Sequence, residues 1–137
     1  MSQTAGYSGR PLAAKLGIKP GMRIKTCGAP KHYLALIAPL PEHVVVSSRL
    51  RTQIDMWHLF TRSDQELARV LKTAQSSIYP DGVIWVSWPK KSSGVASRVT
   101  EDTIRAVALP MGLVDIKVCA VDATWSALKL VIRKSLR

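Results

Sequence analysis

The residues best suited to hold an anion lie directly after a long apolar run. The run VIWVSWP, residues 83–89, is followed by two lysines, two serines and a glycine: Lys90, Lys91, Ser92, Ser93 and Gly94. Ammonium groups and hydroxyls bind phosphate, and a glycine lets the backbone come close to it. The same residues also fit a plain surface position, because lysines solvate a buried strand wherever it reaches water. No GxxxxGKS/T or GxGxxG motif occurs, so the sequence carries no specific nucleotide signature.

Residues 90–94 are called the lysine loop below. The fold that we expect places four further residues beside it. They end or follow expected strands, and are Gly28, Lys31, Arg62 and Trp88. Open α/β sheets bind ligands beyond the carboxyl ends of their strands, so these residues and the lysine loop are candidates for one anion site. Trp88 and Trp125 lie where strands leave the sheet, and there an indole ring can stack on a base.

The sequence predicts no catalytic residue and no metal site. His32, His43 and His58 match no metal-binding spacing, and an apolar run such as that around His58 usually holds a core histidine. Cys27 beside His32 is a candidate nucleophile with its base. A packed, unreactive thiol is the more common role of a lone cysteine, and we expect that role here.

The chain is strongly basic, with a formal net charge of +11 over 137 residues. Six basic residues and no acidic residue precede Glu42, and the C-terminal KLVIRKSLR is purely basic. Such a field attracts anionic ligands and nucleic acid, and it also keeps a protein soluble. We therefore expect an unidentified anionic ligand or macromolecular partner, with nucleic acid as an alternative and no membrane contact.

Length predicts a single domain. A chain of 137 residues can bury one hydrophobic core and is too short for two ordinary domains. Residues 1–9 are polar and contain two glycines, so we expect a flexible lead-in there and one domain over residues 10–137. Neither a signal-peptide core nor an apolar run near the roughly 20 residues of a membrane span occurs. The expected location is cytoplasmic.

Periodicity predicts alternating strands and helices. Alternation or short β-branched runs indicate strands at 22–27, 44–46 and 54–60, and helical spacing of apolar residues indicates helices at 10–16, 33–38 and 63–74. Ser63 and Glu66 form a capping box, in which each side chain accepts from the backbone N–H of the other residue. The segment YPDG, residues 79–82, predicts a turn.

The second half of the chain extends this pattern. VIWVSW is too continuously apolar to have a face in water, so it predicts an inner strand. Thr100 caps a helix that Pro110 must kink or shorten. The final strands, VDIKVCAV and LKLVIRK, form an antiparallel pair in which Asp115 and Lys117 point to water. The predicted fold class is α/β: a single-domain, Rossmann-like three-layer sandwich with a mostly parallel sheet and a C-terminal antiparallel hairpin.

From residue 54 to 134 the sequence resembles the second half of class I S-adenosylmethionine-dependent methyltransferases. The resemblance is carried by YPDGVIWVSWP, TEDTIRAVALPMG and LVDIKVCAVDATWSALKLVIRK, which match a buried strand, a helix and a closing hairpin. The whole chain, through GYSGRPLAAKLGIKPGMRI, LPEHV and WVSWPKKSSG, more specifically resembles a bacterial family known only as a domain of unknown function. The first resemblance implies S-adenosylmethionine as a cofactor, and the second implies no activity.

Two positions depart from the methyltransferase pattern. The turn after the first strand, residues 27–31 (CGAPK), has one glycine and a proline where those enzymes have a glycine-rich turn. Residues 47–49, SSR, supply no carboxylate for the ribose hydroxyls. We therefore expect a non-enzymatic or vestigial binding domain with a basic ligand or partner edge. The alternatives are a small S-adenosylmethionine-dependent methyltransferase and a basic nucleic-acid or ribosome-associated protein, and no cofactor is assigned.

Overall fold

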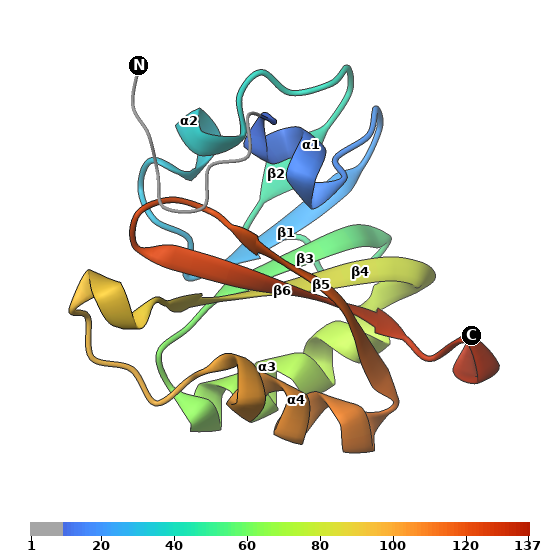
Figure 1. Ribbon diagram of the computed structural model, residues 1–137. Coiled ribbons are helices and arrows are strands. Elements are labelled where there is room, and N and C mark those ends of the chain that lie inside the picture. Colours follow the sequence, from blue (N-terminus) through green and yellow to red (C-terminus); the bar gives the residue numbers. More distant parts are fainter. Residues whose placement is uncertain (1–9) are drawn as a thin grey trace.

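The computed structural model describes residues 10–137, which form a six-stranded sheet flanked by helices (Figure 1). The strands are β1 (Arg23–Cys27), β2 (Val45–Ser47), β3 (Ile54–Phe60), β4 (Ile78–Pro89), β5 (Leu113–Ala120) and β6 (Trp125–Ile132). The α-helices are α1 (Leu12–Leu16), α2 (Tyr33–Ile37), α3 (Asp64–Ser77) and α4 (Glu101–Ala108), and the 3₁₀ turns are η1 (Lys91–Ser93), η2 (Leu109–Met111) and η3 (Lys134–Leu136). The lead-in predicted at residues 1–9 lies outside the described residues.

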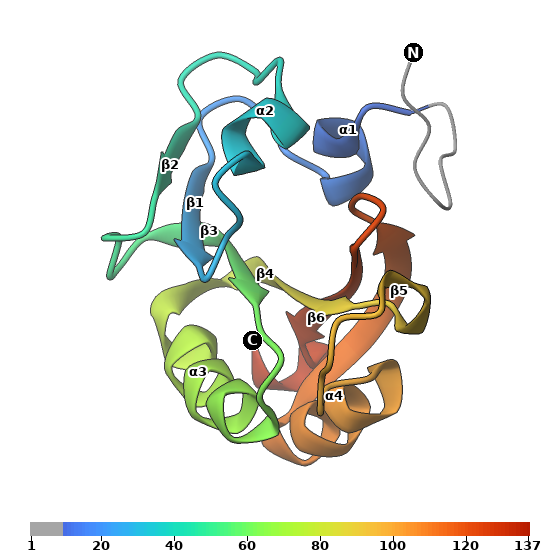
Figure 2. The same ribbon diagram turned by 90° about the vertical axis from the view of Figure 1, so that its left-hand side faces the viewer.

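The strands follow the order β2-β1-β3-β4-β6-β5. β2, β1, β3 and β4 run parallel, whereas β6 is antiparallel to β4 and to the edge strand β5. α1 and α2 lie on one face of the sheet, and α3 and α4 lie on the other (Figures 1 and 2). The predicted Rossmann-like three-layer fold with a C-terminal antiparallel hairpin is therefore confirmed. Within residues 10–137, no helix has the length and apolar character needed to cross a bilayer.

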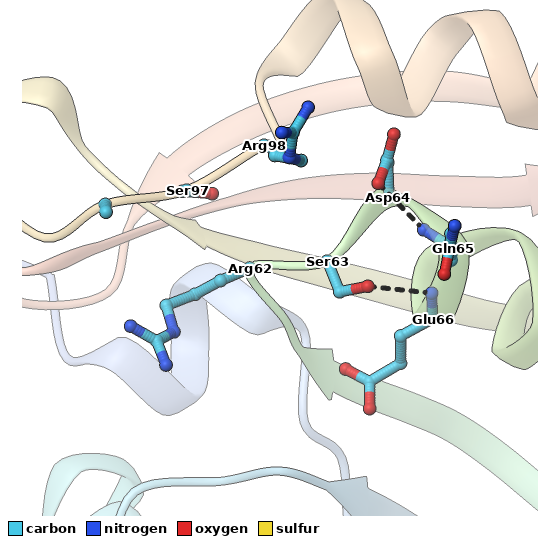
Figure 3. A pocket seen from close by; sticks show the side chains of 8 residues that line it. Arg62, Ser63, Asp64, Gln65, Glu66, Ser97 and Arg98 are labelled. Atoms are coloured by element: carbon cyan, nitrogen blue, oxygen red, sulfur yellow. Dashed lines mark hydrogen bonds between the residues drawn. The ribbon is translucent and has the colours of Figure 1, made fainter.

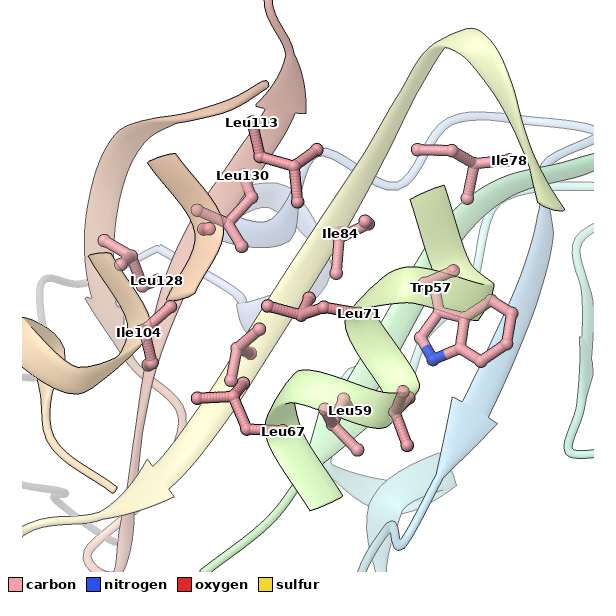
Figure 4. Close-up of a cluster of buried hydrophobic side chains, with 14 of the residues drawn as sticks. Trp57, Leu59, Leu67, Leu71, Ile78, Ile84, Ile104, Leu113, Leu128 and Leu130 are labelled. Carbon is pink, nitrogen blue, oxygen red and sulfur yellow. The ribbon is translucent and has the colours of Figure 1, made fainter. Parts of the chain in front are cut away.

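The face under α3 and α4 is a continuous apolar core. α3 turns Leu67, Leu71 and its other apolar residues inward at helical spacing, and they pack against β3 and β4 (Figure 4). Ile104 of α4 extends this core toward Leu128 and Leu130 of β6. The amphipathic pattern that predicted α3 therefore also places its buried face correctly.

Side-chain caps start both of these helices. Ser63 Oγ accepts from the Glu66 backbone N–H at 3.1 Å, as predicted. The other half of the predicted capping box is wrong, because the buried Thr61 lies between the partners. Its hydroxyl donates to the Glu66 carboxylate and accepts from the Ser63 N–H. Thr100 caps α4 as predicted, and η2, which contains Pro110, follows directly after the helix.

The face under α1 and α2 encloses a polar network. His58 of β3 is fully buried, with Nδ1 2.9 Å from the Tyr33 hydroxyl and Nε2 2.7 Å from the Ser87 hydroxyl. Burial lowers the pKa of His58 to about 3, so its imidazole is neutral. The Trp85 indole N–H donates to the Leu16 carbonyl at 3.1 Å and holds α1 on the sheet. The prediction that His58 is a core histidine is confirmed.

Residues 79–82, predicted as a turn, are an irregular part of β4. Between the pairs Ile54–Ile78 and Met56–Val83, β3 advances by two residues and β4 by five. The extra residues fold tightly, because a Cβ on Gly82 would lie 2.9 Å from the carbonyl oxygen of the first residue of YPDG. The turn-forming residues therefore produce a bulge inside a strand rather than a connection between elements.

The regular alternation predicted for β5 is wrong at Asp115. Pairing passes from Asp115–Leu130 to Lys117–Lys129, so Ile116 is an extra residue in the strand. Asp115 precedes the bulge and lies on the same face as buried Leu113, where its Oδ2 accepts from Arg105 Nε at 2.8 Å. The bulge moves Lys117 to the other face, and Ile116 is 54% exposed. The hydrogen bond from Arg105 lowers the pKa of Asp115. Lys117 is exposed, as predicted.

Candidate ligand-binding edge

The four parallel strands end at one edge of the sheet, which we call the carboxyl edge. It consists of the loops that follow β1, β2, β3 and β4, residues 28–32, 48–53, 61–63 and 90–100. β1 connects outward to β2, and β3 connects to β4 on its other side, so the topological switch point lies between β1 and β3. Open α/β sheets bind their ligands at such a point. Figure 2 looks toward this edge.

Gly28 lies at the switch point and is required by the backbone there. Its φ is +71°, and a Cβ at this position would lie 2.5 Å from the Phe60 carbonyl oxygen at the end of β3. The first turn therefore packs directly on β3, which only glycine permits. Gly28 and the nearby Lys31 are both exposed, so the predicted residues do reach the surface of this edge.

Arg62 lines an open pocket of about 910 Å³ between the start of α3 and the loop before α4 (Figure 3). Ser63 and Arg98 also line it, and the Arg98 backbone N–H donates to the Arg62 carbonyl at 3.0 Å. The two arginine side chains point in different directions in Figure 3. Asp64 and Glu66 add carboxylates to its lining.

The charged groups of this pocket differ in how they are paired. Within residues 10–137, neither the Arg62 nor the Arg98 guanidinium makes a hydrogen bond or ion pair. The Glu66 carboxylate instead accepts from Thr61, and Asp64 accepts from a neighbouring backbone N–H of α3 at 3.0 Å. The carboxylates are thus used by the start of the helix, and the guanidinium groups remain available to a ligand.

The lysine loop lies on the same edge but does not line this pocket. Lys91 and Ser92 are exposed, and the Ser93 hydroxyl donates to the Lys90 carbonyl at 2.6 Å within η1. The Lys90 backbone N–H donates to the Thr124 carbonyl at 2.8 Å and fixes the loop to the β5–β6 hairpin. The four predicted residues therefore form a separate part of the carboxyl edge.

Arg98 is a candidate site residue that was not predicted from the sequence. It lies in the same connection as the lysine loop, two residues before Thr100, the cap of α4. The backbone hydrogen bond to Arg62 brings the end of this connection onto the end of β3. The sequence shows only that a basic residue lies in a loop at the carboxyl edge. It does not show where this loop turns back toward β3.

The prediction that Trp88 can stack on a ligand is wrong. The side chain is 9% exposed and packs in the apolar core under α3 and α4. β4 continues to Pro89, so Trp88 is still inside the sheet. Trp125 is half-buried, with its ring edge-on to that of Phe60 at 5.1 Å between centroids. The tryptophans are packing residues here.

Cys27 and His32 do not form a nucleophile and base. His32 Nε2 lies 3.3 Å from a carboxylate oxygen of Asp122, in the β5–β6 hairpin. Burial raises the pKa of the Cys27 thiol, which packs against the apolar core and is not activated. Among the described residues, no group of three or more His, Cys, Asp or Glu side chains could hold a metal ion.

Comparison with protein families gives one match over nearly the whole described chain. Residues 13–134 match the family described as "Protein of unknown function (DUF3052)". The chain belongs to this family. That membership agrees with the resemblance carried by the sequence motifs and assigns no activity. No curated protein matches the sequence.

Solved structures share the fold at low sequence identity. Aeropyrum pernix fibrillarin, with natively bound S-adenosyl-L-methionine, aligns with a TM-score of 0.58 and 16% identity over 88% of this chain and 73% of its own. A putative type 11 methyltransferase from Sulfolobus solfataricus gives 0.58 and 13% over 90% and 89%. A Methanococcus jannaschii fibrillarin pre-rRNA processing protein gives 0.56 and 10% over 84% and 68%. At these identities the likeness shows a methyltransferase-like fold alone.

Proposed function

We propose that this domain binds a phosphate-bearing anion at its carboxyl edge. The observation that carries the proposal is that a cation follows each of the four parallel strands. These cations are Lys31 after β1, Arg49 after β2, Arg62 after β3, and Lys90 with Lys91 after β4. Loops that are far apart in the chain thus bring positive charge to the edge at which this class of fold binds ligands.

The four loops of the carboxyl edge contain no carboxylate, and carboxylates beside them are already bonded. Glu66 in the first turn of α3 accepts from Thr61, and Glu101 in the first turn of α4 accepts from Arg105. Asp122 of the β5–β6 hairpin approaches this edge, but its carboxylate accepts from two backbone N–H groups and lies against His32. Cations whose neighbouring carboxylates are bonded elsewhere attract anions to this edge.

The groups at the carboxyl edge are suited to binding. A guanidinium donates paired N–H groups to phosphate oxygens, and a lysine ammonium adds a compact positive charge. Arg62 and Arg98 line the pocket, their guanidinium groups have no partner among residues 10–137, and Ser63 adds a hydroxyl at the start of α3. These side chains donate to an anion rather than exchange protons with a substrate, so we assign binding and no reaction.

A phosphate titration at low salt tests the proposal. The full chain is compared by calorimetry with Arg62→Gln/Arg98→Gln and with a control, Lys72→Gln/Lys134→Gln, which removes equal charge from exposed positions outside the carboxyl edge. Losing two charge-assisted contacts should weaken binding of inorganic phosphate or ATP by about tenfold or more. Equal weakening in the control would show that net charge alone attracts the anion and would overturn the proposal.

Binding of an adenosyl cofactor is the second candidate. It is favoured by the fold likeness to a fibrillarin that holds S-adenosyl-L-methionine. A ligand at about 100 times its dissociation constant adds about 2.7 kcal/mol to the free energy of unfolding, which a thermal-shift assay detects. Stabilisation by S-adenosylmethionine and S-adenosylhomocysteine, with none by phosphate, would replace the anion proposal with this candidate. Binding of RNA alone, with an affinity that falls steeply with salt, would instead support the nucleic-acid alternative.

A further inference from the structure

The carboxyl end of β2 carries arginine where an adenosyl-binding fold carries an acid. Residues 47–53, SSRLRTQ, contain two arginines and no carboxylate. In dinucleotide-binding folds, an acidic residue near this position accepts from the ribose hydroxyls, whereas an arginine accommodates a phosphate on the ribose. The residues after β2 therefore determine which kind of ribose the carboxyl edge can accept.

Arg49 is placed to make that contact. It is exposed, and within residues 10–137 its guanidinium makes no hydrogen bond or ion pair. Its backbone N–H donates to the Ser47 hydroxyl oxygen at 3.0 Å, which holds the turn that follows β2. Because the Ser47 hydroxyl accepts in this bond, its own proton is free to be donated to an anion.

A row of three side chains crosses the neighbouring strands. Ser47 of β2, Lys25 of β1 and Trp57 of β3 are paired in register, so their side chains lie on one face of the sheet. The Lys25 ammonium donates to the Ser48 carbonyl at 2.5 Å and lies 5.3 Å from the centre of the Trp57 ring. A second positive charge is thus held at the base of the Arg49 turn. The Trp57 indole N–H is buried and has no hydrogen-bond partner among the described residues.

We infer that this end of β2 binds a phosphate carried on the ribose of a nucleotide ligand. The inference rests on the proposed function, because it places the rest of the nucleotide along the carboxyl edge. Arg49 supplies paired N–H donors, Ser47 supplies a hydroxyl donor, and Lys25 supplies positive charge. A ribose with both hydroxyls free finds no carboxylate here to accept from it.

Two pairs of ligands that differ by one ribose phosphate test this site. NADP against NAD measures the effect of a 2′-phosphate, and coenzyme A against dephospho-coenzyme A measures that of a 3′-phosphate. The phosphorylated member of one pair should bind the full chain about tenfold more tightly in calorimetry. Arg49→Gln should abolish this preference. Arg51→Gln, which removes the same charge two residues further along the exposed loop, should keep it.

The outcomes separate this inference from the proposed function. No preference in either pair, or equal loss of preference in the two variants, overturns the ribose-phosphate site. If inorganic phosphate still binds in a manner that depends on Arg62 and Arg98, the proposed function stands while the inference falls. If phosphate and all four nucleotides fail to bind, both fall. Circular dichroism of the two variants verifies that each is folded, as expected for substitutions of exposed side chains.

Discussion

The two faces of the sheet are held by different kinds of interaction. Under α3 and α4 the buried side chains form one apolar cluster, and the 14-residue helix α3 packs a continuous buried stripe against the strands. Under α1 and α2, which have five residues each, the core also contains the hydrogen-bonded set Tyr33, His58 and Ser87. A long amphipathic helix can be fixed by buried area, whereas a helix of five residues has little stability of its own and depends on specific partners.

The largest loss of stability is expected for a substitution in the apolar core under α3 and α4. Leu71→Ala leaves a cavity between α3 and the sheet, and should lower the free energy of unfolding by about 3–5 kcal/mol in urea denaturation. Lys72→Ala, at the next and exposed position of the same helix, should change it by less than about 0.5 kcal/mol. A loss below about 1 kcal/mol for Leu71→Ala would mean that this face is not close-packed.

Lowering the pH should destabilise the protein through the buried His58 of the polar network under α1 and α2. Unfolding exposes His58 to water and raises its pKa from about 3 to the ordinary 6.5, so between these values the unfolded chain binds more protons than the folded one. The contribution of neutral His58 is fully present above pH 6.5 and is lost as the pH falls through this window. The free energy of unfolding should therefore fall by about 1.4 kcal/mol per pH unit between pH 6 and 4.

Urea denaturation at a series of pH values measures this slope. His58→Gln removes the buried imidazole and should flatten the profile within the window. His32→Gln removes an exposed imidazole that lies against Asp122, and should leave the slope in place. An unchanged slope in His58→Gln would assign the acid sensitivity to other groups.

A smaller effect should follow from removing one bond of the polar network. Tyr33→Phe keeps the ring and deletes the hydroxyl, leaving Nδ1 of His58 buried without its partner. The expected loss is about 1–2 kcal/mol in the free energy of unfolding. Tyr79→Phe, at a position that is 39% exposed, is the matched control and should have almost no effect. Equal losses in the two variants would indicate that the hydroxyl of Tyr33 contributes nothing specific.

The smallest effect on stability is expected at the carboxyl edge. Lys31→Ala/Lys91→Ala removes two exposed cations that belong to neither hydrophobic cluster, so the melting temperature should move by only about a degree or two. The phosphate affinity should fall in the same variant if these lysines contribute to the edge. A drop in melting temperature above about 5 °C would show that the loops support the fold itself.

The apolar core under α3 and α4 could be predicted because the residues that form its helix are close together in the sequence. The spacing of Leu67, Val70, Leu71 and Ala74 gives both the helix and its buried side, and Ser63 gives its first residue. The polar face could not be predicted in this way. Tyr33 and Ser87 lie 25 and 29 residues from His58, and only the sheet topology brings the three together.

The carboxyl edge lies between these cases. Strand ends are visible in the sequence, so Lys31, Arg62 and the lysine loop could be assigned to one edge. The path of the connection between β4 and α4 could not, and it is this path that places Arg98 beside Arg62. Trp88 was placed wrongly because a residue at the end of an apolar run can be the last one covered by the core or the first one outside it.

The extra residue in β5 affects how readily the protein aggregates through the edge of its sheet. Among the described strands, β5 forms one edge of the sheet, where Ile116 interrupts the ladder and Lys117 follows it, and β2 at the other edge has only three residues. Short strands, bulges and lysines deprive an incoming chain of the regular row of N–H and C=O groups that it needs for pairing. Deleting Ile116 would restore such a row beside exposed Val118. The bulge thus disfavours edge-to-edge aggregation, and it does so independently of any ligand.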